Sequence, residues 1–400
     1  MKVSAIICEY NPLHNGHVHH IQETRRHGAT HIIALLSSNF VQRGDVALLP
    51  KFDRAQLAVR AGADLVIELP VAFSCAAAED YATGAVTLLH SLGIVDELSF
   101  GSSAGDLEDL SLLTEASLST TQIYGKRIAD LMKEGNSYPA AVWEVIAQRY
   151  NRQVAAKMHD PNNILAIEYL KAMLKTGASF QPFTIPRRYV MHDSELPVNQ
   201  FASASFIRKS ILESDLNYVG FVPTYTAKML ADRMDEGKTA TLRRLERAVL
   251  YRMRTISREE MMSLPDMNDA LYNRFYAARH ANTLDEMLGS VKIKCFTMAR
   301  IRRAMMHAMI GVRREALKVA PPYARVLAFN DRGRELLGYA RKRSAVPMHT
   351  SLAKLRDTSP ICRAFVAMEE RASDVYGLAQ RETTSSQEDY RARITMGGNL

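Results

Sequence analysis

Apolar and polar positions alternate in blocks through the first hundred residues. Apolar runs rich in Ile, Val and Leu alternate there with segments of helical spacing, which predicts βαβ crossovers and a parallel sheet covered on both faces. In such sheets the ligand binds beyond the carboxyl ends of the strands, so we expect site residues just after Ile7, Leu36, Leu69 and Phe100. The apolar runs are residues 3–10, 31–37, 64–70 and 97–102, and the helical segments are residues 14–28, 51–63 and 76–93.

The pattern changes farther along the chain. Residues 106–175 have mostly helical spacing, residues 183–188 fit a last strand, and residues 203–214 fit a helix. From about residue 216 strand patterns vanish and helical spacing continues. We therefore predict two domains: residues 1–220 as an α/β unit with a Rossmann-like parallel sheet, and residues 221–400 as a mainly α-helical unit.

Charge is divided unevenly between these two parts. The 400 residues hold 51 Lys and Arg against 43 Asp and Glu, a net charge of +8. Residues 1–215 contain 19 basic and 23 acidic residues, a net of −4, whereas the remainder contains 32 and 20, a net of +12. Opposite signs suggest two tasks, and the basic half points to a polyanion such as nucleic acid.

Several protein classes are excluded by the sequence. No run approaches the roughly 18 to 20 apolar residues of a membrane span, and the short apolar run at the N-terminus is broken by Glu9, unlike a signal peptide. The four cysteines are far apart and form no CxxC pair, which argues against a structural zinc site or a disulfide scaffold. We expect a cytoplasmic protein without membrane attachment and without a metal site built from its own side chains.

The strongest motif is His14-Asn15-Gly16-His17, which directly follows the first predicted strand and opens the first helix. A helix N-terminus presents free N–H groups and a positive dipole end to a phosphate, and Gly16 lets the backbone approach a ligand closely. Imidazoles three residues apart share one helix face and can stabilise charge that develops at a phosphorus atom. Two surface histidines, or a metal site that includes His19 or His20, are the weaker readings.

A second anion cradle is predicted at Ser203, Ser205 and Arg208, where two hydroxyls and a guanidinium open a helix. By itself this pattern is as typical of ordinary helix capping. Arg43, Lys51 and Arg54 add positive charge that is either on the phosphate side or merely solvated. Asn162 and Asn163 either cap a helix or contact a nucleotide, and Arg187 with Arg188 ends the last predicted strand, at a ligand edge or facing solvent.

The basic half contains one stretch, from Met287 to Arg314, that has no acidic residue. A helix whose charges are all cationic suits RNA phosphates, whereas an ordinary packed helix explains its apolar stripe but not the missing acids. Arg341–Arg343 is weaker evidence of the same kind. The RNA-binding residues that we predict are Lys292, Lys294, Arg300, Arg302 and Arg303.

HxGH after the first strand, with Ser-x-Ser-x-x-Arg downstream, resembles the nucleotidylyltransferase superfamily related to class I aminoacyl-tRNA synthetases. Within it, the order of motifs resembles the tRNA(Met) cytidine acetate ligase family over nearly the whole chain. The motifs that carry this resemblance are EYNPLHNGH, SSNFVQRGD, GADLVIELP, Phe100-Gly101, PNNILAIEYLKA, ASASFIRK, KCFTMARIRRAMMHAMIGV and YARVLAFNDRGRELL.

The resemblance implies a nucleotidylyltransferase domain that forms acetyl-adenylate from ATP and acetate, with His14 and His17 as catalytic residues and Mg²⁺ accompanying the triphosphate. The acetyl group would then pass to N4 of the wobble cytidine of elongator tRNA(Met). Two departures from the family pattern, Ser103 in place of an acid and Ala166 in place of Gly, concern details of the adenosine or acetate pocket. The expected ATP contacts are Ile7, Cys8, Glu9, Tyr10, Asn11, Pro12, Leu13, His14, Asn15, Gly16, His17, Val18, His19, His20, Gly101, Asn162, Arg187 and Arg188, with Ser203, Ser205 and Arg208 from the second cradle.

Two other functions remain open at this point. One is an adenylyltransferase for a small phosphorylated metabolite, against which the 185-residue basic extension argues. The other is a non-enzymatic, nucleotide-sensing RNA-binding protein, against which the intact HxGH motif argues. The sequence indicates no oligomeric state.

Overall fold

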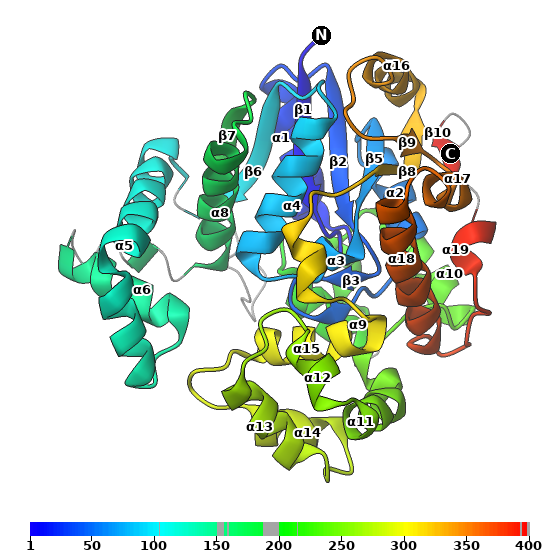
Figure 1. The fold of residues 1–400 in the computed structure, drawn as a ribbon. Helices are drawn as coiled ribbons and strands as arrows, with labels where there is room; N and C mark the ends of the chain where they lie inside the picture. The colour runs from blue at the N-terminus through cyan, green and yellow to red at the C-terminus, as the bar shows by residue number, and fades with distance from the viewer. Residues whose placement is uncertain are drawn as a thin grey trace.

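The computed structural model describes residues 1–103, 105–149, 156–157, 160–186, 200–213, 215–392 and 394–397 (Figure 1). The first half of the chain, as far as the last parallel strand, comprises β1 (Val3–Cys8), α1 (Asn15–Arg26), β2 (His31–Ser37), β3 (Phe40–Val41), β4 (Asp45–Val46), α2 (Lys51–Arg60), β5 (Leu65–Leu69), α3 (Val71–Ser74), α4 (Ala78–Ser91), β6 (Glu97–Ser102), α5 (Leu107–Lys133), α6 (Tyr138–Arg149), α8 (Pro161–Thr176) and β7 (Gln181–Pro186). The second half comprises α9 (Ala204–Leu212), η2 (Leu216–Phe221), α10 (Thr224–Asp235), η3 (Leu242–Leu245), α11 (Glu246–Thr255), α12 (Arg258–Met262), α13 (Asp269–Ala278), α14 (Leu284–Val291), α15 (Met298–Ile310), η4 (Arg314–Lys318), β8 (Ala324–Asn330), α16 (Asp331–Ala340), β9 (Met348–His349), α17 (Leu352–Arg356), α18 (Pro360–Leu378), α19 (Glu388–Arg391) and β10 (Thr395–Gly397).

The main sheet has the strand order β10-β8-β5-β2-β1-β6-β7, with β9 beside β8. The five strands β5, β2, β1, β6 and β7 are parallel, and Cys8 at the end of β1 lies opposite Leu36 of β2. Strands β2 and β6 have the predicted bounds, and the other predicted strands of this part differ by a few residues at their ends. The predicted α/β class with a Rossmann-like parallel sheet is therefore confirmed.

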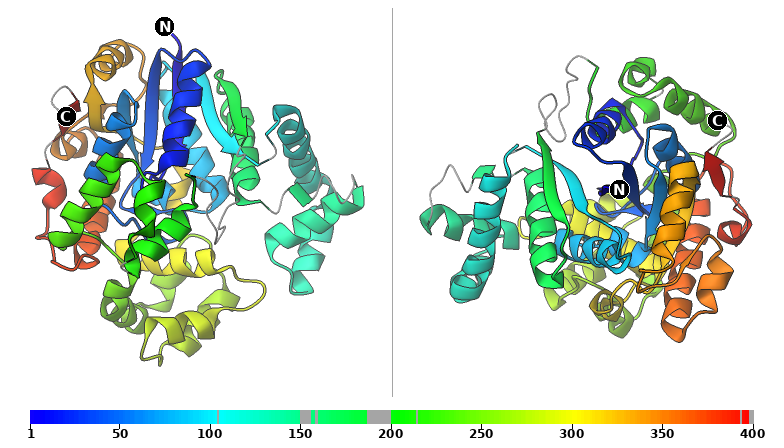
Figure 2. Two further views of the ribbon diagram at one scale, coloured as in Figure 1. Left: turned by 180° about the vertical axis from the view of Figure 1, so that it is seen from behind. Right: turned by 90° about the horizontal axis from the view of Figure 1, so that it is seen from above.

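Helices cover both faces of the sheet, as seen from above in Figure 2. Alternate residues of one strand enter different cores: Ala5 packs in one hydrophobic core, with α4, α8 and α18, whereas Ile6 packs in the other, with α1, α2 and α9. Because both faces are buried, each strand reads as a continuous apolar run instead of an alternating one.

Three strands come from the C-terminal part, so the prediction that strands vanish after about residue 216 is wrong. Strand β8 pairs antiparallel with β5, and β9 and β10 pair with β8. The strand pattern of β8 is interrupted by Arg325, which is 1% exposed. A boundary near residue 220 stays a prediction, but the sheet takes strands from both sides of it.

Two helical regions extend from the sheet. Helices α5 and α6 stand to one side, with a small core of their own (Figure 1). Helices α11, α13 and α14 lie at the lower end in Figure 1, with α15 between them and the sheet. Helix α15 contacts α11 and α14 as well as β4. Among the described residues, no helix has both the length and the apolar character needed to cross a membrane.

Candidate active site

A cavity of about 400 Å³ lies at the carboxyl ends of the parallel strands, where the crossover rule places a ligand. Its walls come from the loop after β1, the start of α1, the end of β6, and the first turns of α8 and α9. The predicted residues that line it are Ile7, Cys8, Glu9, Tyr10, Asn11, His14, Gly16, His17, His19, His20, Gly101, Asn162, Ser203 and Arg208.

The HxGH motif forms the N-terminal cap of α1. His14 is the N-cap residue, and its Nδ1 atom accepts a hydrogen bond of 3.1 Å from the backbone N–H of Gly16. The backbone N–H of His14 donates to Nδ1 of His17 at 3.3 Å, and the two imidazole rings stack with centroids 3.7 Å apart. Since both Nδ1 atoms accept, each ring in its neutral form carries its proton on Nε2.

Gly16 is required by this cap. A Cβ atom at position 16 would lie 2.9 Å from Cε1 of His14, too close for the ring to stay over the first turn. The glycine therefore acts here through the placement of the histidine ring, in addition to the close backbone approach that the motif suggests.

Charged side chains also line the cavity. Glu9 accepts a hydrogen bond of 2.9 Å from the backbone N–H of Gln42, and Arg208 donates to the backbone carbonyl of Asn11 at 2.7 Å. Burial raises the pKa of Glu9, while that N–H group and Arg208, Arg43 and Arg54 oppose the rise. Gln42 and Arg43 also line the cavity, so the loop after β2 contributes to it, as the strand-end rule predicts.

The second predicted cradle is formed only in part. Ser203 is the N-cap of α9, where its Oγ accepts from the N–H of Phe206 at 3.1 Å, and it lines the cavity together with Arg208. Ser205 does not line the cavity. Its Oγ lies 3.5 Å from Nη2 of Arg208, so this hydroxyl faces the guanidinium, and the cavity receives one serine from the pair.

The cavity also has an apolar wall that the sequence analysis missed. It includes Phe100 and Tyr169, whose rings are 5.9 Å apart, and Leu165. Asn162, Leu165 and Tyr169 share one face of α8 because they are three and four residues apart, and that spacing was the available signal. Other lining residues that were not predicted are Ile6, Ala78, Tyr81, Ile164, Ile185, Pro186, Phe201, Ala202 and Ala204.

Asn162 carries a buried polar atom that has no partner in the described part of the chain. Asp160 caps α8 and Asn163 accepts from the N–H of Ser103 at 2.9 Å, so of the two asparagines only Asn162 lines the cavity. Its Nδ2 is buried and has no hydrogen-bond partner among the described residues. Because leaving a buried donor unpaired is costly, this amide is suited to a ligand acceptor.

Some predicted nucleotide contacts lie elsewhere. Pro12, Leu13, Asn15 and Val18 do not line the cavity. Leu13 is buried in a hydrophobic core, and the amide of Asn15 donates to the backbone carbonyls of Gln200 and Gly220. Arg187 and Arg188 lie outside the described residues.

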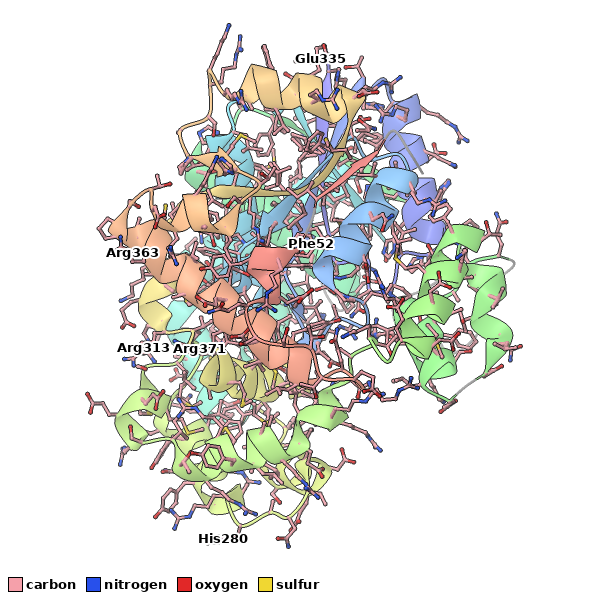
Figure 3. All side chains as sticks on the ribbon, turned by 90° about the vertical axis from the view of Figure 1, so that its right-hand side faces the viewer. Phe52, His280, Arg313, Glu335, Arg363 and Arg371 are labelled. Carbon is pink, nitrogen blue, oxygen red and sulfur yellow. The ribbon has the colours of Figure 1, made fainter. Side chains whose placement is uncertain are left out.

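Lys51 and Arg54 are neither solvated nor among the residues that line the cavity, which corrects both readings of the sequence. Arg54 is fully buried and donates to the backbone carbonyls of Leu49, Glu9, Ser37 and Ser38. It therefore ties the ends of β1 and β2 together. Lys51 is 1% exposed and belongs to a buried charge cluster. Its Nζ atom lies 5.8 Å from the ring of Phe52, which is labelled in Figure 3. The cluster consists of Lys51, Glu68, Arg325, Glu369 and Asp389.

The cationic helix α15 faces the interior more than the sequence suggests. Arg303 is 7% exposed; it donates to the backbone carbonyl of Gln42 at 3.2 Å and pairs with Asp266 at 3.3 Å. Both Nε and Nη2 of Arg300 donate to the carbonyl of Asp266. Arg302 is half-buried near Asp45, whereas Lys292 and Lys294 are exposed. The RNA role predicted for the arginines stays a prediction, but their positions are explained by contacts within the protein.

The two departures from the family pattern are away from the cavity. The Oγ of Ser103 donates to Asp160 at 2.8 Å, and Ala166 is buried in a hydrophobic core. Neither residue lines the cavity. Tertiary contacts therefore place both substitutions behind the wall.

The described part of the chain gathers no cluster of metal ligands, and the cysteine of the cavity wall is not an activated nucleophile. Three or more His, Cys, Asp or Glu side chains with the geometry of a metal site do not come together there. Cys8 lines the cavity, but burial strongly raises the pKa of its thiol, so the reactive thiolate is disfavoured. The arrangement is suited to positioning an anion and stabilising its charge.

Known proteins support a family assignment over the full length. Residues 1–391 match the family model described as HIGH Nucleotidyl Transferase. The tRNA(Met) cytidine acetate ligases of Thermoanaerobacter sp. (strain X514) and Thermoanaerobacter pseudethanolicus are 35% and 36% identical, each over 98% of both chains. Crystal structures of Thermotoga maritima TmcAL cover 99% of both chains: the apo form has a TM-score of 0.93 at 28% identity, and the form bound with alpha-thio ATP has 0.91 at 27%. On these grounds the chain belongs to the tRNA(Met) cytidine acetate ligase family of HIGH nucleotidyl transferases.

Proposed function

We propose that this protein is an ATP-dependent acetate ligase that acetylates N4 of the wobble cytidine of elongator tRNA(Met). The observation that carries the proposal is the pair of stacked histidines at the N-terminus of α1, which opens into the cavity at the strand ends. Support also comes from the names of the relatives and from the alpha-thio ATP bound to Thermotoga maritima TmcAL.

The first step is a substitution at the α-phosphorus of ATP. A carboxylate oxygen of acetate forms the new O–P bond, the bond to the bridging oxygen of pyrophosphate breaks, and pyrophosphate leaves with that electron pair. His14 and His17 donate from Nε2 to phosphate oxygens that gain charge, together with N–H groups of the first turn of α1. Arg43 and Arg208 line the cavity, which supports a role for them in holding the outer phosphates. Arg187 and Arg188 keep their predicted role in ATP binding.

The nucleoside fits the apolar wall of the cavity. Phe100 and Tyr169 offer apolar ring surface for a base, and the unpartnered Nδ2 of Asn162 offers a donor for one of its acceptors. This arrangement follows the usual design of a small-molecule site, with apolar walls and a few fixed polar groups.

The second step transfers the acetyl group. The exocyclic N4 of cytidine attacks the carbonyl carbon of acetyl-adenylate, AMP leaves with the bridging oxygen, and N4 loses a proton. No protein nucleophile is needed for either step, in agreement with the buried Cys8 thiol. The mixed anhydride is labile in water, so enclosure of the cavity protects it.

Mg²⁺ fits this chemistry as a companion of the triphosphate. The described residues gather no cluster of metal ligands, and Mg²⁺ with nucleoside triphosphates is bound mainly by phosphate oxygens and water. Among the described residues, Glu9 supplies the carboxylate that lines the cavity. When bound, the ion neutralises charge on the departing pyrophosphate.

The proposal also includes a cytoplasmic location. It is supported by the four cysteines, none of which forms a disulfide, as expected in a reducing compartment.

Isotope exchange between ATP and pyrophosphate tests the reaction. We expect exchange with acetate alone, none with phosphorylated metabolites, and acetylation of elongator tRNA(Met) once the RNA is added. Exchange that depends on a phosphorylated metabolite would instead support the small-metabolite adenylyltransferase, and absence of exchange under all conditions would exclude an enzyme of either kind.

A further inference from the structure

Arginine and tyrosine side chains lie together along the outer surface of α11, α12 and α13. We name the set Arg247, Tyr251, Arg254, Arg258, Tyr272, Tyr276 and Arg279 the Arg/Tyr strip. It lies at the end of the molecule marked by His280 at the bottom of Figure 3. Tyr251 is 70% exposed and Tyr276 is 51% exposed, which is unusual for large aromatic side chains that serve only the fold.

Neighbouring members of the strip are joined by direct contacts. The guanidinium of Arg258 lies 5.1 Å from the ring of Tyr272, whose centroid is 6.0 Å from that of Tyr276. Arg279 lies 3.9 Å from the ring of Tyr276. The strip is therefore continuous along α12 and α13.

A backbone contact joins this half of the strip to α11. Arg254 donates to the carbonyls of Arg279 and Ala281 at 3.2 and 2.8 Å. Arg247, Tyr251 and Arg254 are four and three residues apart, so they share one face of α11. Helices α11 and α13 thus present one surface that combines cations and aromatic rings.

The charge of the strip favours an anionic partner. Residues 247–258 and residues 270–284 contain no acid. Of the acids at their borders, Asp269 pairs with Arg258 at 2.9 Å and Glu246 accepts from the N–H of Leu284 at 2.8 Å, whereas Glu259 is exposed. Arg258 keeps 65% of its side chain exposed in spite of its pair.

We propose that the Arg/Tyr strip is the docking surface for unpaired nucleotides of the substrate RNA, with bases stacked on Tyr251 and Tyr276 and phosphates held by the arginines. Aromatic rings that stack bases, interleaved with cations that hold phosphates, are the arrangement that binds single-stranded RNA and RNA loops. A wobble nucleotide lies in such a loop. The inference rests on the proposed function and goes beyond it by naming the surface.

The position of the strip relative to the cavity agrees with this role. Helix α11 packs on α15, and Arg252 of α11 donates to the carbonyl of Ala308 at 2.9 Å. Helix α15 in turn holds the cavity loop through the bond from Arg303 to Gln42. RNA on the strip would therefore rest on helices that are packed directly against the catalytic half.

The test measures binding of elongator tRNA(Met) to the full chain by fluorescence anisotropy over a range of salt concentrations. The double variant Tyr251→Ala/Tyr276→Ala should bind about tenfold or more weakly, and Tyr251→Phe/Tyr276→Phe should bind within twofold of wild type. Arg247→Gln should lower the slope of log K against log salt by roughly 0.7. Acetate-dependent ATP–pyrophosphate exchange without RNA should be unchanged in every variant.

Tyr339→Ala is the matched control. Tyr339 is 37% exposed, and the guanidinium of Arg343 lies 3.6 Å from its ring. It belongs to α16, at the opposite end of the molecule in Figure 1. We expect it to bind tRNA like wild type. Circular dichroism and thermal melting confirm that each variant is folded.

Three results would overturn the inference. The first is full tRNA affinity in Tyr251→Ala/Tyr276→Ala, and the second is an equal loss of tRNA affinity in Tyr339→Ala. The third is a wild-type dimer that becomes monomeric in the double variant without a change in tRNA affinity. The last result would assign the strip to contacts between copies of the chain. If the wild type catalyses no acetate-dependent exchange and binds no tRNA, the proposed function fails as well. If exchange is normal and tRNA binding does not depend on the Arg/Tyr strip, this inference alone fails.

Discussion

Residues 287–314 and residues 247–258 are both rich in basic residues and free of acids, yet the fold places them in different surroundings. In the first stretch, Arg303 is buried against Gln42 and Asp266, and Arg300 is bound to a carbonyl. In the second, Arg247, Tyr251 and Arg258 are exposed. Arg303 holds the cavity loop, and the exposed set belongs to the Arg/Tyr strip. Lys292 and Lys294 of the first stretch are exposed as well. Cationic composition thus marks both regions, and burial shows that Arg300 and Arg303 are engaged within the protein.

The largest expected effect concerns formation of the acetyl-adenylate, which should depend on His14 and His17 and on neither cationic region. His14→Ala and His17→Ala should each lower acetate-dependent ATP–pyrophosphate exchange about a hundredfold or more, or ~3 kcal/mol, because a donor to the developing charge is lost. Affinity for tRNA should be unchanged. His90→Ala, an exposed histidine at the end of α4, serves as the control, and full exchange in both active-site variants would remove their catalytic role.

Gly44→Ala tests how closely α15 approaches the cavity loop. Gly44 has a φ of 71°, and a Cβ there would lie 2.3 Å from the backbone nitrogen of Arg303. Backbone strain and the clash should together cost about 2–4 kcal/mol of unfolding free energy, measured by urea denaturation. Gly28→Ala is the control, because Gly28 also has a positive φ, 99°, but no atom near its Cβ position. Equal losses in both variants would show that the contact with α15 adds nothing.

Arg303→Ala separates the two roles that a cation on α15 can have. It leaves the carbonyl of Gln42 and the carboxylate of Asp266 without a buried partner, which should cost about 1–3 kcal/mol of unfolding free energy and raise KM for ATP. The salt dependence of tRNA binding should stay as in wild type. A stable variant with a reduced salt dependence would restore Arg303 to the RNA-binding residues predicted from the sequence.

The smallest effect is a pH dependence from the buried charge cluster. Burial and the neighbouring Glu68 raise the pKa of Glu369 from 4.5 to about 8. Lys51 lies 3.7 Å away, Ser38 donates to the carboxyl at 2.8 Å, and the N–H of Val71 also donates to it. The folded state therefore holds this proton more tightly than the unfolded state, so stability falls as pH rises between the two values.

The measurement is the melting temperature from pH 6.5 to 8.5. Below pH 6.5 the fall is opposed by His307, because burial lowers its pKa to about 4 and stability then rises with pH up to its unfolded value. Glu369→Gln should flatten the decline above pH 6.5, since the amide keeps the neutral form at all pH values. An unchanged slope would show that Glu369 is ionised in the folded protein.

Local patterns were sufficient for the parallel sheet and for the centre of the site. Strand-length apolar runs and helical spacing predicted β1, β2, β5 and β6 and the helices between them, and HxGH predicted the cap of α1. Strand β8 was not predicted, because Arg325 interrupts its apolar run and the partners of that arginine, Glu68 and Asp389, are far away in the sequence. The wall of Phe100 and Tyr169 escaped because apolar lining resembles ordinary core.

The fold class, the family and the histidine pair could be predicted because each is encoded locally: strand-length apolar runs and helical spacing for the elements, short motifs for the family, and three residues between the imidazoles. Which cations are buried depends on tertiary packing. Lys51, Arg54, Arg303 and Arg325 are covered by segments up to several hundred residues away, whereas the Arg/Tyr strip stays exposed. A charged side chain carries no local sign of the carbonyl or carboxylate that it will meet, since that partner is fixed by packing.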